Sequence, residues 1–481
     1  MLAHHLRRAL AIASVLLLSA CKSFTPDGGM STVAAVAGGG LNKNIVRISS
    51  PADAALAQNE VAKLMQAPLS ADAAVQIALL NSPGLQAAYN RLGVAEAVMV
   101  QASRPPLPGF SYDWVKTSIE LDIERQIVAS VLSLATWPAR SKLASIRFEQ
   151  AELRAAEETF RLAVETRRAY VRAVAARQIL GALDAAQETA QAAAMLAEKL
   201  VETGAVNKLD LARRQVFATE LEAQVAAARQ EAAATQERLA RLMGLWEASQ
   251  LDALLPRALP RVPAKSLSLA QAEQEAMERR VDLMVARLEA EALAKSFGLT
   301  RATRFINVLD AGGVSKTQKD KGEPSADGGG FNIVFEIPLY DFGRAKVREA
   351  EQRYLEAINN LRQLVLDARS QAREAYGAYS SARAIVAKYD NEVLPLRNTI
   401  SAETELQYNA MQVDAFALLE AARAKAQAEV ASIAAKRNFW LAAVDLSAAV
   451  LGGGHLSQDS PLTVAAADTG GAEGAGAGGG H

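Results

Sequence analysis

The sequence is poor in the side chains on which most enzyme chemistry depends. It contains a single cysteine, Cys21, and four histidines, which all lie near the ends of the chain: His4, His5, His455 and His481. The body of the protein therefore offers neither an imidazole nor a thiol, which leaves acid–base, nucleophilic and zinc chemistry to carboxylates alone. A glycine-rich phosphate loop with a following lysine is also lacking. These absences argue against an enzyme, and the sequence predicts no cofactor and no metal.

Aromatic residues and an excess of positive charge are scarce as well. Aromatic side chains make up 5% of the 481 residues, while alanine is abundant. This composition suits long, closely packed helices better than several compact cores built from large side chains. Lysine and arginine together number 52 against 53 acidic residues, a net charge of −1. Because there is no polybasic signature, we expect no nucleic-acid partner.

The N-terminus has the pattern of an export signal. Arg7 and Arg8 precede an apolar run over residues 9–18, which is too short to span a membrane as a helix. Leu18-Ser19-Ala20-Cys21 resembles the bacterial lipobox, in which the cysteine is lipidated after cleavage. The sequence therefore predicts a signal peptide over residues 1–20, lipidation of Cys21 and a lipidated tether over residues 21–68, rich in Gly, Ala and Ser. Lys22 is not aspartate, so the usual cue for retention in the inner membrane is missing.

The stretch from Phe331 to Leu451 shows the architecture most clearly. Alternating apolar and polar residues from Phe331 to Ile337 indicate a strand with two distinct faces. Two apolar columns, each spaced by seven and offset by four, then predict a coiled coil. The columns are Ile358, Val365, Ala372, Tyr379, Val386, Val393 and Tyr354, Leu361, Ala368, Ala375, Ala382, Tyr389.

The order of helices, strands and long helical arms occurs twice. The pairs Leu69 and Leu267, Arg140 and Arg344, and Gly204 and Met411 are offset by about 200 residues, which indicates an internal duplication. The predicted domains are a first repeat (69–246, β-hairpin about 110–128), a linker (247–266), a second repeat (267–451, β-hairpin about 304–338) and a disordered Gly/Ala-rich tail (452–481). We expect residues 136–140 to close the first hairpin region, and residues 315–330 to form a polar loop.

Four strands per chain cannot close a barrel, because the smallest closed barrels have about eight. In a membrane the edges of an open sheet would carry unpaired backbone groups, each costing several kcal/mol. Assembly of several chains into one barrel would remove these edges. The polar alternate positions would then face a water-filled lumen: Glu120, Asp122, Glu124, Asn332 and Glu336. The residues themselves therefore point to a pore extended by long helical hairpins.

From about Leu69 to Leu451 the chain resembles the TolC-like outer-membrane efflux protein family, in its lipoprotein form. The matching features are Cys21 in its lipobox, Leu85 after Asn81-Ser82-Pro83, the hairpin tip at residues 202–205, and the strand-to-helix junction at residues 338–344. The resemblance implies a mainly α-helical protein with a small transmembrane β part. Three chains would form a 12-stranded β-barrel and an α-helical periplasmic tunnel in the bacterial outer membrane. The family serves as the exit duct of tripartite efflux pumps, joined to an inner-membrane pump by a periplasmic adaptor.

The resemblance also assigns candidate sites. Asp341, Gly343 and Arg344 form the strand-to-helix junction; the first repeat has Thr136-Trp137-Pro138-Ala139-Arg140 in its place. The adaptor would dock on the hairpin tips at Gly204, Ala205, Met411 and Val413, although Met411 stands where glycine is usual. The family narrows its entrance with acidic residues, and the candidates here are Glu420, Asp414 and Asp210. These acids also fit solvated residues or helix-start charges.

Two other functions remain open at this stage. A type I secretion duct for proteins would share the same fold. A lipid-anchored periplasmic coiled-coil adaptor or scaffold would form no channel and would be a monomer or dimer without a membrane-embedded sheet. The transported substrate cannot be read from the sequence.

Overall fold

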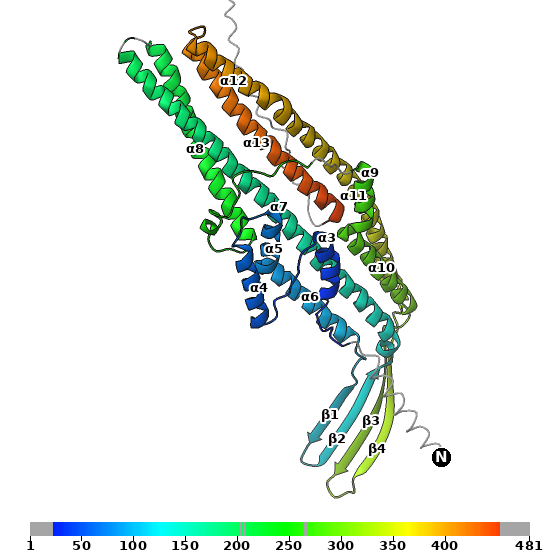
Figure 1. The fold of residues 1–481 in the computed structure, drawn as a ribbon. Coiled ribbons are helices and arrows are strands. Elements are labelled where there is room, and N and C mark those ends of the chain that lie inside the picture. The colour runs from blue at the N-terminus through cyan, green and yellow to red at the C-terminus, as the bar shows by residue number, and fades with distance from the viewer. Residues whose placement is uncertain (1–22, 203, 205–206, 264–267, 453–481) are drawn as a thin grey trace, which may run out of the picture.

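The computed structural model describes residues 23–202, 204, 207–263 and 268–452. An elongated bundle of long helices ends in two hairpin tips, and a four-stranded sheet projects from the opposite end (Figure 1). Short helices lie along the middle of the bundle. The predicted signal peptide, Cys21, Ala205 and the tail from residue 453 lie outside the described residues.

The two repeats contain the same elements in the same order. The first comprises α5 (Ala71–Asn81), α6 (Pro83–Ala102), β1 (Gly109–Lys116), β2 (Glu120–Ser130), α7 (Val131–Glu202) and α8 (Lys208–Leu242). The second comprises α9 (Leu269–Arg279), α10 (Val281–Ala302), β3 (Val308–Asp320), β4 (Ala326–Glu336), α11 (Arg344–Lys388), the π-helix η3 (Tyr389–Val393), α12 (Leu394–Asn409) and α13 (Ala415–Leu451). This order confirms a mainly α-helical fold with long helical hairpins and four strands.

Local sequence signals explain where several helices begin and end. Ser70, Asn207, Ser268 and Asp414 each accept a backbone N–H in the first turn of the following helix, as N-cap residues do. Each of the first- and second-repeat hairpins is followed by a glycine with positive φ, Gly244 and Gly452 respectively. A helix commonly ends beside such a residue because glycine adopts a positive φ without steric strain.

The expectation that residues 136–140 close the first hairpin region is wrong, because these residues lie inside α7, which is 72 residues long. Pro138 removes one helical hydrogen bond, but neighbouring side chains bind nearby carbonyls. The Oγ1 of Thr136 donates to the Leu132 carbonyl at 2.8 Å, and the Nη2 of Arg140 donates to the Ser133 carbonyl at 2.7 Å. The indole of Trp137 donates to the Ser103 carbonyl at 3.0 Å. The Trp137 bond ties the start of α7 to the end of α6.

The sheet is antiparallel throughout, with the order β1-β2-β3-β4. The central pairing joins the repeats, since β2 runs beside β3 from Glu120 opposite Asp320 to Ser130 opposite Asp310. The predicted loop over residues 315–330 is wrong for most of its length. Its residues extend β3 to Asp320 and begin β4 at Ala326. The glycines at residues 328–330 join the strand because their backbone pairs with β3.

The predicted tether over residues 21–68 is wrong from residue 23 onward, because this segment is folded. It forms short helical turns over residues 30–41 and the helix α4 (Pro51–Leu64). Met30, Val33, Ala37 and Leu41 are buried in a hydrophobic cluster with α6 and α7. The apolar residues were sparse among glycines and alanines, so the sequence showed no clear period. The linker after α8 also packs, with Leu251, Leu255 and Leu259 buried against α5 and α7.

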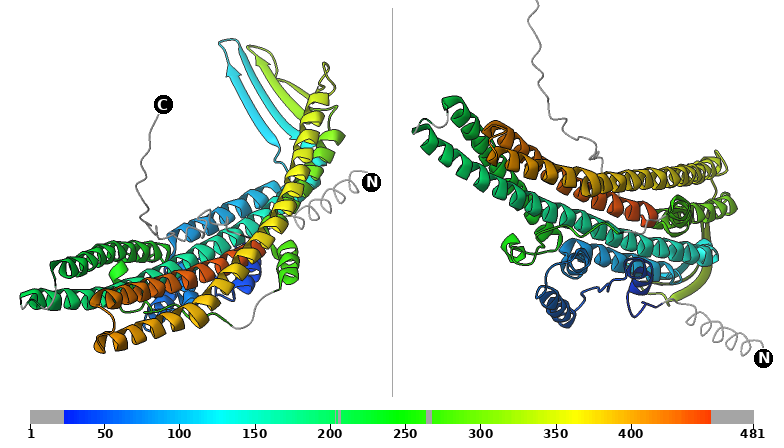
Figure 2. Two further views of the ribbon diagram at one scale, coloured as in Figure 1. Left: turned by 90° about the horizontal axis from the view of Figure 1, so that it is seen from above. Right: turned by 45° about the horizontal axis from the view of Figure 1, so that its top comes forward.

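The bundle is held together largely by small side chains. Figure 2 shows the long helices lying side by side over most of their length. Along α11 and η3, every member of the two predicted heptad columns is buried or half-buried, and Ala368, Ala372 and Ala375 are at most 3% exposed. Such alanines allow helices to approach closely while excluding water. Among the described residues, no helix is both long and apolar enough to cross a membrane.

Candidate functional site

The sheet has one largely apolar face and one acidic face, as the register of its four strands shows. The charged residues on the largely apolar face are Lys116, Arg125, Lys319 and Asp327. The apolar face carries Phe110, Tyr112 and Trp114 on β1, Leu121, Ile123 and Ile127 on β2, and Phe331, Ile333 and Phe335 on β4. The three aromatic side chains of β1 are exposed, as are Phe331 and Phe335. A row of exposed aromatic and branched apolar residues is expected where a strand contacts lipid.

Charged residues gather on the other face. The acids on this face are Asp113, Glu120, Asp122, Glu124, Asp310, Asp320 and Glu336. Lys316 lies among them and pairs with Asp122 at 2.7 Å. The amide of Gln318 donates to Glu120 at 2.6 Å. The polar positions expected from the sequence therefore do share one face, and that face is predominantly acidic.

The edges of the sheet are open in the single chain. Within the described part of the chain, β1 pairs only with β2, and β4 pairs only with β3. Since a strand edge presents unpaired N–H and C=O groups, β1 and β4 are both ready to pair with a further strand. The exposed aromatic residues lie on these same two strands.

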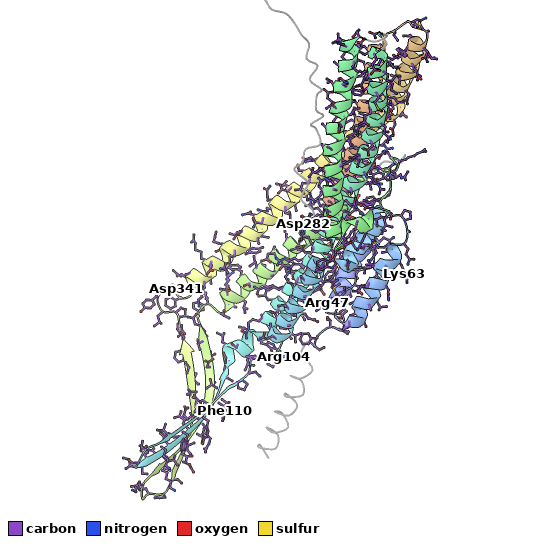
Figure 3. The ribbon with its side chains drawn as sticks, turned by 90° about the vertical axis from the view of Figure 1, so that its left-hand side faces the viewer. Arg47, Lys63, Arg104, Phe110, Asp282 and Asp341 are labelled. Atoms are coloured by element: carbon purple, nitrogen blue, oxygen red, sulfur yellow. The ribbon has the colours of Figure 1, made fainter. Side chains whose placement is uncertain are left out.

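The junction between β4 and α11 is a tight turn organised by Asp341. Figure 3 shows Asp341 where the sheet meets the long helices, with Phe110 farther along the sheet. The Asp341 carboxylate accepts the N–H of Gly343 at 2.9 Å and of Ala345 at 3.1 Å. Gly343 has φ +72°, and an added Cβ would lie 2.2 Å from the Arg304 carbonyl oxygen. The structure therefore gives Asp341 and Gly343 defined roles in this turn, whereas Arg344 is the first residue of the helix.

The two hairpin tips have different turn chemistry. Gly204 follows α7 with φ +73°, a conformation that glycine adopts easily. In the second repeat Met411 takes the equivalent place with φ +59° and is 93% exposed. Its N–H donates to the Tyr408 carbonyl at 2.9 Å, and that of Gln412 donates to the Gln407 carbonyl at 2.8 Å. This is a Schellman ending, in which methionine occupies the glycine position. Val413 is half-buried beside it.

Two of the three candidate gate acids serve as helix-start residues. The Oδ1 of Asp414 caps α13 by accepting the N–H of Ala417 at 2.9 Å. Asp210 lies in the first turn of α8, where its Oδ2 accepts the side chain of Asn207 at 2.9 Å. Both positions suit a carboxylate because the N-terminus of a helix carries partial positive charge. Asp414 and Asp210 therefore both have a structural role at the start of a helix.

Glu420 lies in a different setting, in a cleft between α8 and α13 near the tips. The Arg213 guanidinium stacks 4.6 Å from the Phe416 ring centre, and the Arg423 guanidinium lies 5.9 Å from that of Phe217. Arg423 also pairs with Glu220 at 3.2 Å. Glu420 lines the same cleft and is exposed. The sequence did not reveal these contacts, which join the two repeats, because their partners lie about 200 residues apart.

No model of a protein family matches the sequence, and no curated protein matches it either. Solved structures do match the fold. The CmeC outer membrane channel of Campylobacter jejuni has a TM-score of 0.69 at 18% identity, over 83% of this chain and 87% of that one. VceC, an outer membrane protein of Vibrio cholerae, has 0.65 at 16% identity, over 81% and 96%. The open-state MtrE outer membrane channel of Neisseria gonorrhoeae has 0.64 at 16% identity, over 81% and 89%.

These likenesses define the class of fold. The chain has the TolC-like fold of outer-membrane channels, with long helical hairpins and a small β part. The resemblance that the sequence motifs indicated is thereby confirmed at the level of the fold.

Proposed function

We propose that this protein is the outer-membrane exit channel of a tripartite efflux pump and assembles as a homotrimer. The observation that carries the proposal is the open sheet, apolar and aromatic on one face and acidic on the other. If β1 of each chain pairs with β4 of the next, three sheets close into twelve strands without edges. The apolar faces then meet lipid and the acidic faces line water. The likeness to the solved outer-membrane channels supports this assembly.

The long hairpins would extend the channel into the periplasm. α7 alone is 72 residues long, about 108 Å at 1.5 Å per residue. The hairpin tips at Gly204, Ala205, Met411 and Val413 would receive a periplasmic adaptor, which connects the channel to an inner-membrane pump. Lipidation of Cys21 would anchor the chain in the outer membrane.

We further propose that acidic residues near the tips narrow the periplasmic entrance. Glu420 is the first candidate because it is exposed and lines the cleft between the two repeats. Asp414 and Asp210 stand one to two helical turns closer to the tips and would add negative charge there. In a trimer each position would occur three times around one axis.

Extraction in detergent followed by sizing and bilayer recording tests the function. We expect a heat-sensitive trimer that forms discrete conductance steps in planar bilayers. Replacing Cys21→Ser should weaken anchoring and leave the assembled sheet in the membrane. Release of this variant as a soluble monomer would contradict the channel and favour an adaptor or scaffold. Crosslinking and co-purification of the whole assembly would distinguish a drug-type efflux partner from a protein-secretion partner.

A further inference from the structure

A continuous groove runs between the two hairpins, and we call it the inter-hairpin groove. It consists of one cavity of about 620 Å³ and a second of about 830 Å³, which share five lining residues: Glu374, Ala378, Arg437, Asn438 and Ala442. On α7 the groove is lined by Ala169, Arg172 and Ala176. The intervening Tyr170, Ala173 and Val174 pack against α5. The groove therefore lies on the side of α7 that faces away from the short helices.

The end of the groove nearer the tips is largely apolar, and its Arg423 and Glu220 pair with each other at 3.2 Å. Its lining includes Leu183, Phe217, Leu221, Ile385 and Val430. Small residues from α11 and α13 complete the wall: Gly377, Ala382, Ala426, Ala431, Ala434 and Ala435. Small side chains leave room for the rings or chains of a ligand, and the apolar surface favours their removal from water.

The other end of the groove carries arginines. Arg172 and Arg437 are half-buried, and Arg238 is more exposed. The Arg437 guanidinium donates two hydrogen bonds to the side-chain oxygen of Asn438, at 3.1 and 3.2 Å. Burial, followed by the like charge of Arg172, lowers the pKa of Arg437. An arginine in this setting gains from a bound anion, since its hydrogen bonds to water have been reduced.

Acidic residues line the basic end too, but they are differently placed. Asp445 is paired with Arg168 at 2.5 Å, so its charge is already matched. Glu231 and Glu374 are exposed, and water and salt screen exposed charges more strongly than buried ones. Glu231 is the acid that acts on Arg437 in the opposite sense to Arg172. Among the described residues at this end, Arg437 is therefore a half-buried charge whose hydrogen bonds go to a neutral side chain.

We propose that the inter-hairpin groove binds amphiphilic organic anions, with the anionic group at Arg437 and the apolar body along the alanine-lined end. The recognition follows from charge complementarity at one end and apolar burial at the other. The site is built within one chain. A role of this site in transport rests on the proposed channel function. Binding of the anion does not depend on that function.

Binding of 8-anilinonaphthalene-1-sulfonate to the full-length protein in lipid nanodiscs tests the site, with empty nanodiscs as the blank. N-Phenyl-1-naphthylamine has the same ring frame without the sulfonate and serves as the neutral comparison. We expect Arg437→Gln to weaken binding of the sulfonate about tenfold, as for loss of one charge-assisted hydrogen bond. The neutral compound should bind both proteins alike. Glu374→Gln should strengthen sulfonate binding, because it removes a nearby negative charge.

Matched controls separate this site from general effects. Arg353→Gln, which removes an exposed arginine of α11 outside the groove, should leave sulfonate binding unchanged. Arg437→Lys should retain part of the affinity, and a thermal unfolding curve for each variant reports whether it is folded. Equal sulfonate binding by the parent, Arg437→Gln and Glu374→Gln proteins would overturn the proposal. If the proteins then still form trimers that conduct normally in bilayers, only the groove proposal fails and the proposed channel function stands.

Discussion

The side chain of Asn81, at the end of α5, fastens the end of α8. Its Nδ2 donates to the carbonyl oxygens of Met243 at 3.1 Å and Gly244 at 2.8 Å. The second repeat makes the corresponding connection with different chemistry: Arg280, between α9 and α10, donates to the Ala449 carbonyl at 3.4 Å near the end of α13. The duplicated architecture is thus preserved at the base of both hairpins although the residues have changed.

Replacing Gly244→Ala should destabilise the protein by about 2–4 kcal/mol. Gly244 has φ +69°, and an added Cβ would lie 2.4 Å from the Asn81 carbonyl oxygen. Thermal and denaturant unfolding followed by circular dichroism measure the change. Gly181→Ala is the matched control, because this exposed glycine of α7 has no atom within 4 Å of the added Cβ. It should be neutral or stabilising by up to about 1 kcal/mol. Equal stability of the two variants would refute the steric argument.

Replacing Met411→Gly should raise stability by about 0.5–1 kcal/mol, because glycine relieves the strain of a side chain at positive φ. If the tip contacts an adaptor, the same change should weaken adaptor binding, since it removes a side chain that is 93% exposed. Unfolding curves and co-purification with the adaptor measure these two effects. An unchanged adaptor affinity would remove Met411 from the docking surface.

Asp414 allows capping and charge to be separated. Asp414→Asn keeps an N-cap side chain and should leave stability nearly unchanged, whereas Asp414→Ala should cost about 1 kcal/mol. Both variants remove the same negative charge. If Asp414 contributes to the entrance, both should lower cation selectivity in planar bilayers to a similar extent. A selectivity change in the alanine variant alone would instead reflect altered helix structure.

Glu420→Gln should change single-channel conductance or cation selectivity in planar bilayers, because it removes an exposed carboxylate from the proposed entrance. The comparison is Glu405→Gln, an exposed acid of α12 outside the cleft between α8 and α13. Parent-like conductance and selectivity in the Glu420 variant would exclude this residue from the constriction.

Glu152 predicts a pH dependence of stability. Burial raises its pKa from 4.5 to about 7, helped by the nearby charges of Glu149, Asp27 and Glu96 and opposed by a hydrogen bond with Thr32. Between pH 4.5 and 7 the folded state holds a proton that the unfolded state has released. Stability should therefore fall as pH rises through this window.

Since Glu152 is half-buried, solvent screening reduces the effect to about 1–2 kcal/mol. Glu152→Gln should remove this part of the pH dependence and raise the melting temperature at pH 8 more than at pH 5. An equal change at both pH values would mean that the carboxyl titrates normally in the folded protein.

The sequence predicted the features that depend on regular patterns. Period-two alternation at residues 331–337, heptad spacing from Tyr354 to Tyr389 and the break after Asn409 all correspond to elements of the structure. The internal duplication was also predicted correctly, because equivalent positions in the two repeats keep similar side chains. Prolines and glycines led to wrong predictions where tertiary contacts outweighed their local preference for turns and loops. Pro138 lies inside a helix, and the glycines at residues 328–330 lie inside a strand.

Contacts between distant segments could not be predicted. The groove around Arg437 is formed where α7, α8, α11 and α13 lie close together. The spacing of residues along the sequence does not indicate which helices come together there. The folded segment before α4 is similar, since the Thr25 hydroxyl and backbone N–H both bind Glu96, 71 positions away, at 2.6 Å. A segment with too few apolar residues to show a periodic pattern can still fold when it packs against apolar residues of α6 and α7.

The π-helix η3 has a consequence for the second hairpin. A π-helix amounts to one extra residue in an α-helix, so side chains beyond it are rotated by about 100° relative to those before it. The heptad seam that buries Ala372, Tyr379 and Val386 is therefore not continued along α12, where Leu396, Ile400 and Leu406 are exposed. The π-helix thus divides the arm into two parts. The heptad-seam side chains of α11 are covered by the same chain, whereas the three named side chains of α12 are exposed and accessible to a second chain.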